Sequence, residues 1–189
     1  MKKILLLGSN SQLSKEIEKE LKFKKIKILK ISKNNINFES KSSGRKLNKF
    51  LSVRKPDYIV VCIGIFENNN ANFLKIFNVN CKPAWELIRY YIINNTENVK
   101  IMFIGSSAYN KRRKNYILYT ASKTSLNSIA NSAKDLFKKT NIKINIINPP
   151  AMKSKMRKNF FRKNNNLNSN VVEIEPTIIA KDILKKLKL

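Results

Sequence analysis

Residues 100–123 read KIMFIGSSAYNKRRKNYILYTASK, and this stretch decides the fold. The apolar, largely β-branched run 101–104 stops at Gly105, which predicts a buried strand that ends in a turn. After a basic loop, Tyr119 and Lys123 are spaced i, i+4, so a helix would place the phenol and the ammonium on one face. We therefore expect a strand, a loop and a helix that bring polar groups together at the end of the strand.

These residue types suit proton transfer at a carbonyl or alcohol oxygen. A phenol has a reference pKa of about 10, too high for efficient proton exchange near neutrality, and a lysine one turn away would lower it. The hydroxyl of Ser106, at the strand end, could then bind the same substrate oxygen.

The stretch resembles the active site of the short-chain dehydrogenase/reductase family, in which a strand-end serine is followed by Tyr-x-x-x-Lys. Ser106 precedes Tyr119 by the spacing usual in that family, 119 − 106 = 13 residues. The sequence Asn-Val-Asn at 78–80 also resembles a family segment whose asparagine bends a helix and holds a water in the proton relay. The resemblance implies catalytic roles for Ser106, Tyr119, Lys123 and Asn80.

Length and composition predict one domain over residues 1–189. No apolar run reaches the roughly 18 residues of a membrane span, and the apolar run near the start is too short for a signal peptide, so we expect no membrane association. The two cysteines, Cys62 and Cys81, occur in a chain without histidine, which makes a zinc site improbable and is typical of a reduced, cytoplasmic protein.

The net charge of +27 has two interpretations. Lysine, asparagine and isoleucine are abundant throughout, as in the product of an A/T-rich coding sequence, and such basicity can be a solvated background. The alternative is a preference for anionic ligands. Nucleic-acid binding rests on charge alone, because only Phe160 and Phe161 supply the aromatic rings that single-strand binders interleave with basic residues.

The first segment reads as a strand over residues 3–8, a turn, and an amphipathic helix over residues 12–23. An ordinary N-capped turn, with Ser9, Asn10 or Ser11 as the cap, would explain the turn fully. In dinucleotide-binding folds the same turn carries three glycines, which let the backbone approach a pyrophosphate.

Only Gly8, the first of those glycines, is present. In the G-x-x-G-x-x-G register of the family's extended branch, Ser11 and Ser14 take the second and third places. In the G-x-x-x-G-x-G register the second place falls on Gln12.

Further strands are expected over residues 26–31, 58–64 and 142–147, and helices over 45–53, 73–93 with an interruption near Pro83, 122–139 and 178–187. The continuous apolar run after Asp57 indicates burial on both faces of a parallel sheet. The expected fold is a Rossmann-like α/β domain, a doubly wound parallel sheet with helices on both faces, and it lacks the last strand usual in the family.

The resemblance implies a nicotinamide cofactor. The basic Ser-Lys-Asn at 32–34 favours NADP(H) over NAD(H), because an acidic residue there would suit the NAD ribose. Asn37 or Glu39 would contact adenine, Gly64 would lie against the cofactor, and Ser154 would take the place of a threonine that binds the nicotinamide carboxamide. The cofactor-binding residues expected are Gly8, Ser11, Gln12, Leu13, Lys33, Asn37, Gly64, Tyr119, Lys123, Pro149 and Ser154.

Residues 151–175 correspond to the substrate lid of the family, although their polar composition fits a disordered segment equally. The basic loop 111–114 and the lid cations would face one cleft, which favours a phosphate-bearing or acidic substrate such as a nucleotide sugar or an acyl carrier. A merely solvated loop is the alternative. The lid cations are Lys153, Lys155, Arg157, Lys158, Arg162 and Lys163.

Two functions from different classes fit the chain. The first is an oxidoreductase that transfers a hydride between nicotinamide and a small carbonyl or alcohol substrate. The second is a non-catalytic nucleotide-binding or regulatory module, suggested by the serines in the turn and by Pro150 in place of a glycine. The resemblance also implies a homodimer or homotetramer built on the helices that begin near Phe73 and Tyr119.

Overall fold

A computed structural model describes residues 1–94, 98–164 and 171–189, and in it five parallel strands form one sheet. The strands are β1 (Lys2–Leu7), β2 (Ile26–Ile31), β3 (Tyr58–Val61), β4 (Val99–Ile104) and β5 (Ile142–Ile147). Their order is β2-β1-β3-β4-β5, with Leu5 paired to Leu29 on one side and to Ile59 on the other. The chain reverses its winding between β1 and β3, and ligands of doubly wound sheets bind at the carboxyl ends of strands next to such a reversal.

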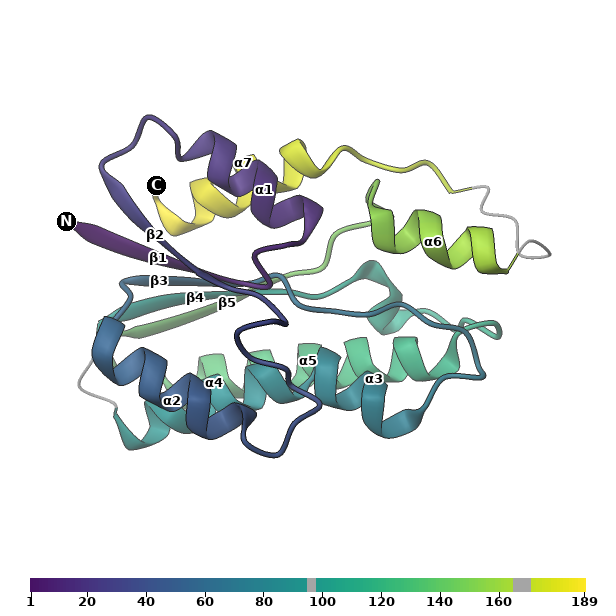
Figure 1. The fold of residues 1–189 in the computed structure, drawn as a ribbon, viewed down its shortest axis with the longest axis horizontal. Coiled ribbons are helices and arrows are strands. Elements are labelled where there is room, and N and C mark those ends of the chain that lie inside the picture. The colour runs from purple at the N-terminus through teal and green to yellow at the C-terminus, as the bar shows by residue number, and fades with distance from the viewer. Residues whose placement is uncertain (95–97, 165–170) are drawn as a thin grey trace.

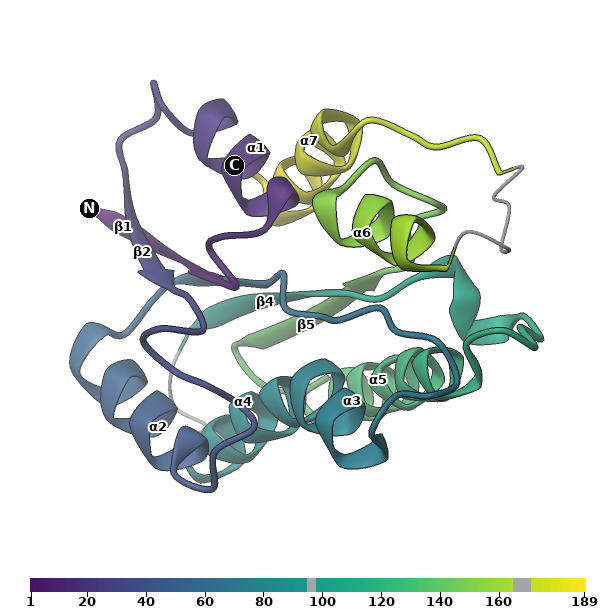
Figure 2. The same ribbon diagram turned by 45° about the vertical axis from the view of Figure 1, so that its right-hand side comes forward.

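Helices cover both faces of the sheet, as Figure 1 and Figure 2 show. One face carries α1 (Gln12–Glu20) and α7 (Pro176–Leu187), with α6 (Lys155–Lys163) on the same side near the carboxyl ends of the strands. The other face carries α2 (Ser43–Arg54), α3 (Phe73–Asn80), α4 (Lys82–Ile93) and α5 (Ile117–Leu136). The architecture is the Rossmann-like α/β fold that the sequence predicts.

The strand side chains divide between two apolar cores, one on each face. Leu5 and Leu7 of β1 belong to the core under α2, α4 and α5, whereas Ile4 and Leu6 belong to the core under α1 and α7. All four are fully buried. Because neighbouring side chains of a strand point to opposite faces, a sheet covered on both sides needs apolar residues at every position.

The structure moves several element boundaries. The interruption expected near Pro83 falls at Cys81, between α3 and α4. The strand expected over 58–64 ends at Val61, and the helix expected to reach residue 139 ends at Leu136. Residues 165–170 of the expected lid lie outside the described residues. Across the ranges that the structure describes, no helix is both long and apolar enough to cross a membrane.

Candidate active site

Tyr119 and Lys123 lie one turn apart on α5, and both are buried. Tyr119 is 8% exposed and Lys123 is 4% exposed. The Lys123 Nζ atom lies 5.9 Å from the centroid of the Tyr119 ring, so the two side chains share one face of the helix, as their spacing predicts.

Lys123 reaches the end of β4, where its ammonium donates to the Ile104 carbonyl at 3.3 Å. Burial lowers the pKa of Lys123 to about 8, and the nearby thiols Cys81 and Cys62 act in the opposite direction. A lysine that titrates near neutrality can exchange its proton under physiological conditions, which an ordinary lysine does only rarely.

Tyr119 packs against two aromatic rings, and a third ring joins this cluster through Phe66 and Tyr116. The Phe66 ring centroid lies 4.6 Å from that of Tyr119, and the Tyr116 centroid lies 6.1 Å from it. Phe160 of α6 stacks on Phe66, with centroids 3.9 Å apart. This aromatic cluster, Phe66, Tyr116, Tyr119 and Phe160, separates the tyrosine from bulk water.

The enclosure changes the acidity of Tyr119. Burial raises the pKa of Tyr119 above its ordinary value of 10.0, while the nearby Ser106 hydroxyl and the positive charge of Arg157 act to lower it. The expectation that Lys123 would hold this pKa below its usual range is therefore wrong for this structure. The physical reason is that desolvation disfavours the phenolate more than the neighbouring donor and cation favour it.

Ser106 follows the last residues of β4 and opens a 3₁₀ turn over Ser107–Asn110. Its hydroxyl oxygen accepts from the Ala108 N–H at 3.2 Å, and its own N–H donates to Asn148 Oδ1 at 3.2 Å. These contacts fix the serine from both sides, in the lining of the cavity that Tyr119 also lines.

Asn148 is held in turn by Asn127, whose Oδ1 accepts from Asn148 Nδ2 at 2.7 Å. Asn127 lies four residues beyond Lys123 and therefore on the same face of α5. A Cβ at Gly105 would approach Asn148 Oδ1 to 1.9 Å, which explains the glycine at the end of β4. One face of α5 thus carries Tyr119 and Lys123 and also braces the segment that holds Ser106.

Removal of the Asn127 amide is expected to destabilise the segment after β5, where Asn148 lies. Asn127→Ala leaves the part-buried Asn148 amide without its acceptor, which costs about 1 kcal/mol in the free energy of unfolding. Urea denaturation measures the loss. Asn131→Ala, at an exposed position of the same helix, is the control and should change stability far less. Equal effects of the two substitutions would contradict this role of Asn127.

Asn80 is the last residue of α3, immediately before the division at Cys81. Its Oδ1 accepts from the Ile65 N–H at 2.8 Å, and its Nδ2 donates to the Ile65 carbonyl at 3.1 Å and to Ser122 Oγ at 2.9 Å. The amide therefore ties the segment after β3 to α5. It lies behind that segment and does not line the cavity described below.

The turn between β1 and α1 is closed by serines instead of glycines. Ser11 caps α1 and accepts from the Ser14 N–H at 3.1 Å, which selects it among the three caps that the sequence allowed. The Ser14 hydroxyl donates to the Gly8 carbonyl at 3.0 Å, and Ser14 is fully buried. A hydroxyl at the third glycine position thus fits by making a hydrogen bond inside the turn.

Gly8 itself cannot be replaced. It has φ +96°, and a Cβ there would lie 2.8 Å from the carbonyl carbon and oxygen of Cys62. Gly8→Ala is expected to lower the free energy of unfolding by at least about 2 kcal/mol, because backbone strain adds to the clash.

The control for this prediction is Gly64→Ala, since a Cβ at Gly64 meets its nearest atoms at an ordinary 3.5 Å. That change should alter stability by less than about 0.5 kcal/mol. Thermal and urea unfolding of both variants provide the comparison, and a Gly8→Ala protein as stable as Gly64→Ala would refute the argument.

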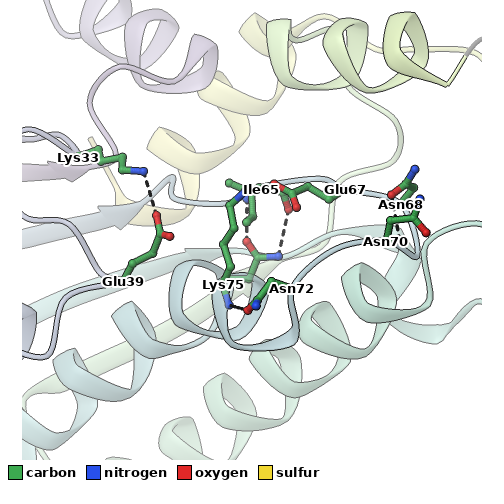
Figure 3. A network of polar contacts seen from close by, with 9 residues as sticks. Lys33, Glu39, Ile65, Glu67, Asn68, Asn70, Asn72 and Lys75 are labelled. Carbon is green, nitrogen blue, oxygen red and sulfur yellow. Dashed lines mark hydrogen bonds and ion pairs between the residues drawn. The ribbon is translucent and has the colours of Figure 1, made fainter.

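The residues after β2 form a polar group of their own. Lys33 Nζ donates to Glu39 Oε1 at 2.9 Å, as Figure 3 shows. Asn37 Oδ1 accepts from the Glu39 N–H at 3.1 Å. The lysine that the sequence suggested for a 2′-phosphate is therefore paired with a carboxylate, an interaction that sequence reasoning did not foresee.

The loop after β3 is also well ordered by its side chains. Asn72 caps α3 by accepting from the Lys75 N–H at 3.0 Å, and the Lys75 ammonium donates to Glu67 Oε1 at 2.6 Å (Figure 3). Asn68 Nδ2 donates to Asn164 Oδ1, just beyond α6, at 2.7 Å. The loop thus holds the end of the lid helix.

Part of the expected lid is a helix. Ser154 caps α6 by accepting from the Arg157 N–H at 3.2 Å, and Phe160 is 3% exposed against the aromatic cluster. Of the six lid cations expected to face the cleft, Lys155 and Arg157 line the cavity and the other four do not, because Lys153 pairs with Glu175 and α6 points its remaining cations elsewhere.

A cavity of about 930 Å³ crosses the carboxyl ends of the strands. It brings together all the predicted site residues except Asn80: Gly8, Ser11, Gln12, Leu13, Lys33, Asn37, Gly64, Ser106, Tyr119, Lys123, Pro149 and Ser154. Its lining includes Lys15, the basic loop 111–114 and the two lid cations, but, among the residues that the structure describes, no aspartate or glutamate. The cavity is therefore strongly cationic.

Sequence reasoning missed several residues of this site. Phe66 was not singled out from the sequence, yet it is the centre of the aromatic cluster. Asn127 and Asn69, which brace the site from α5 and from the loop after β3, carried no recognisable motif in an asparagine-rich chain. The i+8 spacing of Asn127 from Tyr119 was the one available signal.

A parallel sheet with a strand-end serine and a Tyr-x-x-x-Lys helix at one cavity defines the class of dinucleotide-dependent oxidoreductases. The model of the short chain dehydrogenase family matches residues 2–165, and the chain belongs to that family. As such it is an NAD(P)-dependent oxidoreductase that acts on CH–OH or C=O groups. No curated protein matches the chain.

Solved structures of low sequence identity share the fold. A short chain dehydrogenase from Burkholderia cenocepacia J2315 in complex with NADP superposes with a TM-score of 0.82 at 12% identity, over 100% of this chain and 86% of that one. The 3-alpha-hydroxysteroid dehydrogenase from Pseudomonas sp. B-0831, complexed with NADH, gives 0.82 at 14% identity over 98% and 89%. A mutant 4-hydroxyisoleucine dehydrogenase complexed with NADH and succinate gives 0.83 at 20% identity over 98% and 90%.

Proposed function

We propose that this cavity interconverts a carbonyl and an alcohol, with Tyr119 as the proton donor or acceptor and Ser106 as the second group on the substrate oxygen. The observation that carries the proposal is that Ser106, Tyr119 and Lys123 line one cavity together with the N-terminus of α1. A phenol that is merely structural would not need a cationic neighbour in a largely apolar enclosure.

The residues present fit a dinucleotide. Gln12 and Leu13, the first residues of α1, have N–H groups without acceptors in their own helix, and both residues line the cavity. A helix N-terminus of this kind suits a pyrophosphate. Gly64 is not required by protein packing, since a Cβ there makes only ordinary contacts, which supports its assignment to the cofactor. Pro149 and Ser154 would lie at the nicotinamide end.

In the proposed mechanism the bound nicotinamide supplies or accepts the hydride. Tyr119 donates its proton to the carbonyl oxygen during reduction and removes it during oxidation, and its raised pKa keeps it protonated for the reductive direction. Ser106 hydrogen-bonds the same oxygen as charge develops. Lys123, with its pKa near 8, restores the proton of Tyr119, and Asn80 holds the backbone beside it.

NADP(H) remains the proposed cofactor, although the pairing of Lys33 with Glu39 weakens the support that Lys33 gives. Lys15 and Lys33 both line the cavity, and Lys33 follows the end of β2, which supports binding of a 2′-phosphate. Glu39 is the competing group, because it pairs with Lys33 and is itself suited to ribose hydroxyls. Binding of NADP(H) would require Lys33 to exchange Glu39 for the phosphate.

An acidic or phosphate-bearing substrate, such as a nucleotide sugar or an acyl carrier, is supported by the cationic lining of the cavity. The structural neighbour with succinate bound shows a related fold that accommodates a carboxylate ligand, and supports this class. The homodimer or homotetramer implied by the family stays a prediction that sedimentation equilibrium would test.

The proposed function is tested by titrating the protein with NADPH and NADH while nicotinamide fluorescence is followed, and then by a carbonyl-substrate screen. We expect saturable binding of at least one cofactor, tighter for NADPH, and its oxidation by a carbonyl compound. Failure of both cofactors to bind would reject the oxidoreductase and favour the non-catalytic module.

A further inference from the structure

The basic loop 111–114 is held in place from two directions. Asn69 Nδ2 donates to the Lys114 carbonyl at 2.6 Å, and Asn69 Oδ1 accepts from the Ile117 N–H at 2.9 Å, so one amide clamps the end of the loop. Tyr116 packs edge-on against Phe66, with ring centroids 4.9 Å apart. A loop that was only a solvated run of charge would not need these attachments.

Arg113 differs from its three basic neighbours. Lys111, Arg112 and Lys114 are exposed, whereas Arg113 is half-buried in the lining of the cavity. Its Nε is enclosed and, among the described residues, has no hydrogen-bond acceptor. An enclosed donor of a charged group without an acceptor is costly, and such groups in a folded protein call for an explanation.

No carboxylate of the described chain lines the cavity to supply that acceptor. Arg157, the other arginine that faces the aromatic cluster, already binds Glu173 at 2.5 Å, and Lys123 donates to a carbonyl. A planar guanidinium with a free edge is suited to a carboxylate or phosphate, which it can bind through two parallel hydrogen bonds.

We propose that Arg113 binds the anionic group, carboxylate or phosphate, of the carbonyl substrate. This inference rests on the proposed function, which supplies the carbonyl as the reacting group of the substrate. Phe66 and Tyr116 pack beside Tyr119 and line the same cavity as Arg113, so a substrate whose carbonyl and anionic group are joined by an apolar portion would suit this lining. Arg113 is thereby a specificity-determining residue.

The test is calorimetric titration of the full chain at constant ionic strength with malonate, inorganic phosphate and neutral malonamide, each with and without NADPH. We expect malonate or phosphate to bind saturably and malonamide not to bind. Tighter binding of malonate would indicate a carboxylate substrate, and tighter binding of phosphate would indicate a phosphate-bearing one. Arg113→Gln should weaken that anion about 10-fold to 100-fold, and Arg113→Lys less, as loss of a charged hydrogen bond implies.

Arg162→Gln is the matched control, because it removes the same charged group from an exposed position of α6 that does not line the cavity. It should change anion affinity by less than about 3-fold. The inference is overturned if neither anion binds, or if Arg113→Gln and Arg162→Gln weaken binding equally. NADPH binding and turnover of neutral carbonyl compounds would then still stand. Conversely, if no cofactor bound and no carbonyl compound were reduced, the proposed oxidoreductase function would fail, but an anion site that depends on Arg113 would still stand.

Discussion

Tyr119→Phe is expected to lower kcat for carbonyl reduction by about 10³-fold, within the range attributed to general acid catalysis. The substitution removes the hydroxyl that would protonate the substrate oxygen, but it keeps the ring that packs against Phe66 and Tyr116. Cofactor affinity and thermal stability should therefore change little. Turnover is followed by nicotinamide absorbance with a carbonyl substrate found in the screen.

Tyr109→Phe is the control for this result. Tyr109 lies in the short 3₁₀ turn that follows Ser106, outside the cavity lining, so its hydroxyl should not affect kcat. If Tyr119→Phe kept more than about a tenth of the activity, Tyr119 would not be the acid. A loss of activity that came with unfolding would be visible in the melting curve and would be assigned to structure.

Lys123→Met is expected to raise the stability of the fold while it abolishes turnover. Lys123 is almost fully buried, and its ammonium has the Ile104 carbonyl as its hydrogen-bond partner at 3.3 Å. Replacement of an isolated buried charge by an apolar chain of similar length stabilises proteins by about 1–3 kcal/mol. We expect a gain of that size in urea denaturation at pH 7, with kcat lowered at least about 10²-fold.

The pH dependence of stability gives a second measurement of Lys123. Its pKa is lowered from 10.5 to about 8 on folding, so between these values the unfolded chain binds more protons than the folded one. Unfolding free energy should therefore rise with pH across this window, by about 1 kcal/mol per unit, and the cost of the buried charge is fully present below pH 8. The difference between the wild type and Lys123→Met isolates this contribution from the other lysines.

Lys134→Met provides the matched control, since Lys134 lies exposed on the same helix. It should leave both kcat and the pH dependence of stability close to those of the wild type. A Lys123→Met protein less stable than the wild type at pH 7 would show that the ammonium stabilises the fold, and the argument would fail.

The fold and the reactive residues were predictable because they follow from local periodicity. Continuous apolar runs indicate strands buried on both faces, and the i, i+4 spacing of Tyr119 and Lys123 fixes their common face whatever surrounds them. Ser106 was predictable for the same reason, since the end of an apolar run marks the end of a strand. These inferences need only a few consecutive residues.

The environment of the site depends on contacts between distant segments, and no periodicity encodes them. Phe66 and Phe160 are 94 residues apart in the sequence, 160 − 66 = 94, yet they stack on each other. The pair Lys33 and Glu39, and the Ser14 hydroxyl on Gly8, depend on how a turn closes in three dimensions. The direction of the Tyr119 pKa shift was wrong from sequence because it is set by this enclosure and not by the neighbouring lysine.

The stacking of Phe160 on Phe66 links the position of α6 to the protonation of the active site. These rings exclude water from Tyr119, and that exclusion raises its pKa. The packing of α6 over Tyr119 favours the neutral phenol. By thermodynamic reciprocity, the neutral phenol therefore favours this packing of α6, and the phenolate opposes it. Loss of the Tyr119 proton would then loosen α6. The chemical step and the release of product would in this way be coupled through the aromatic contacts of α6.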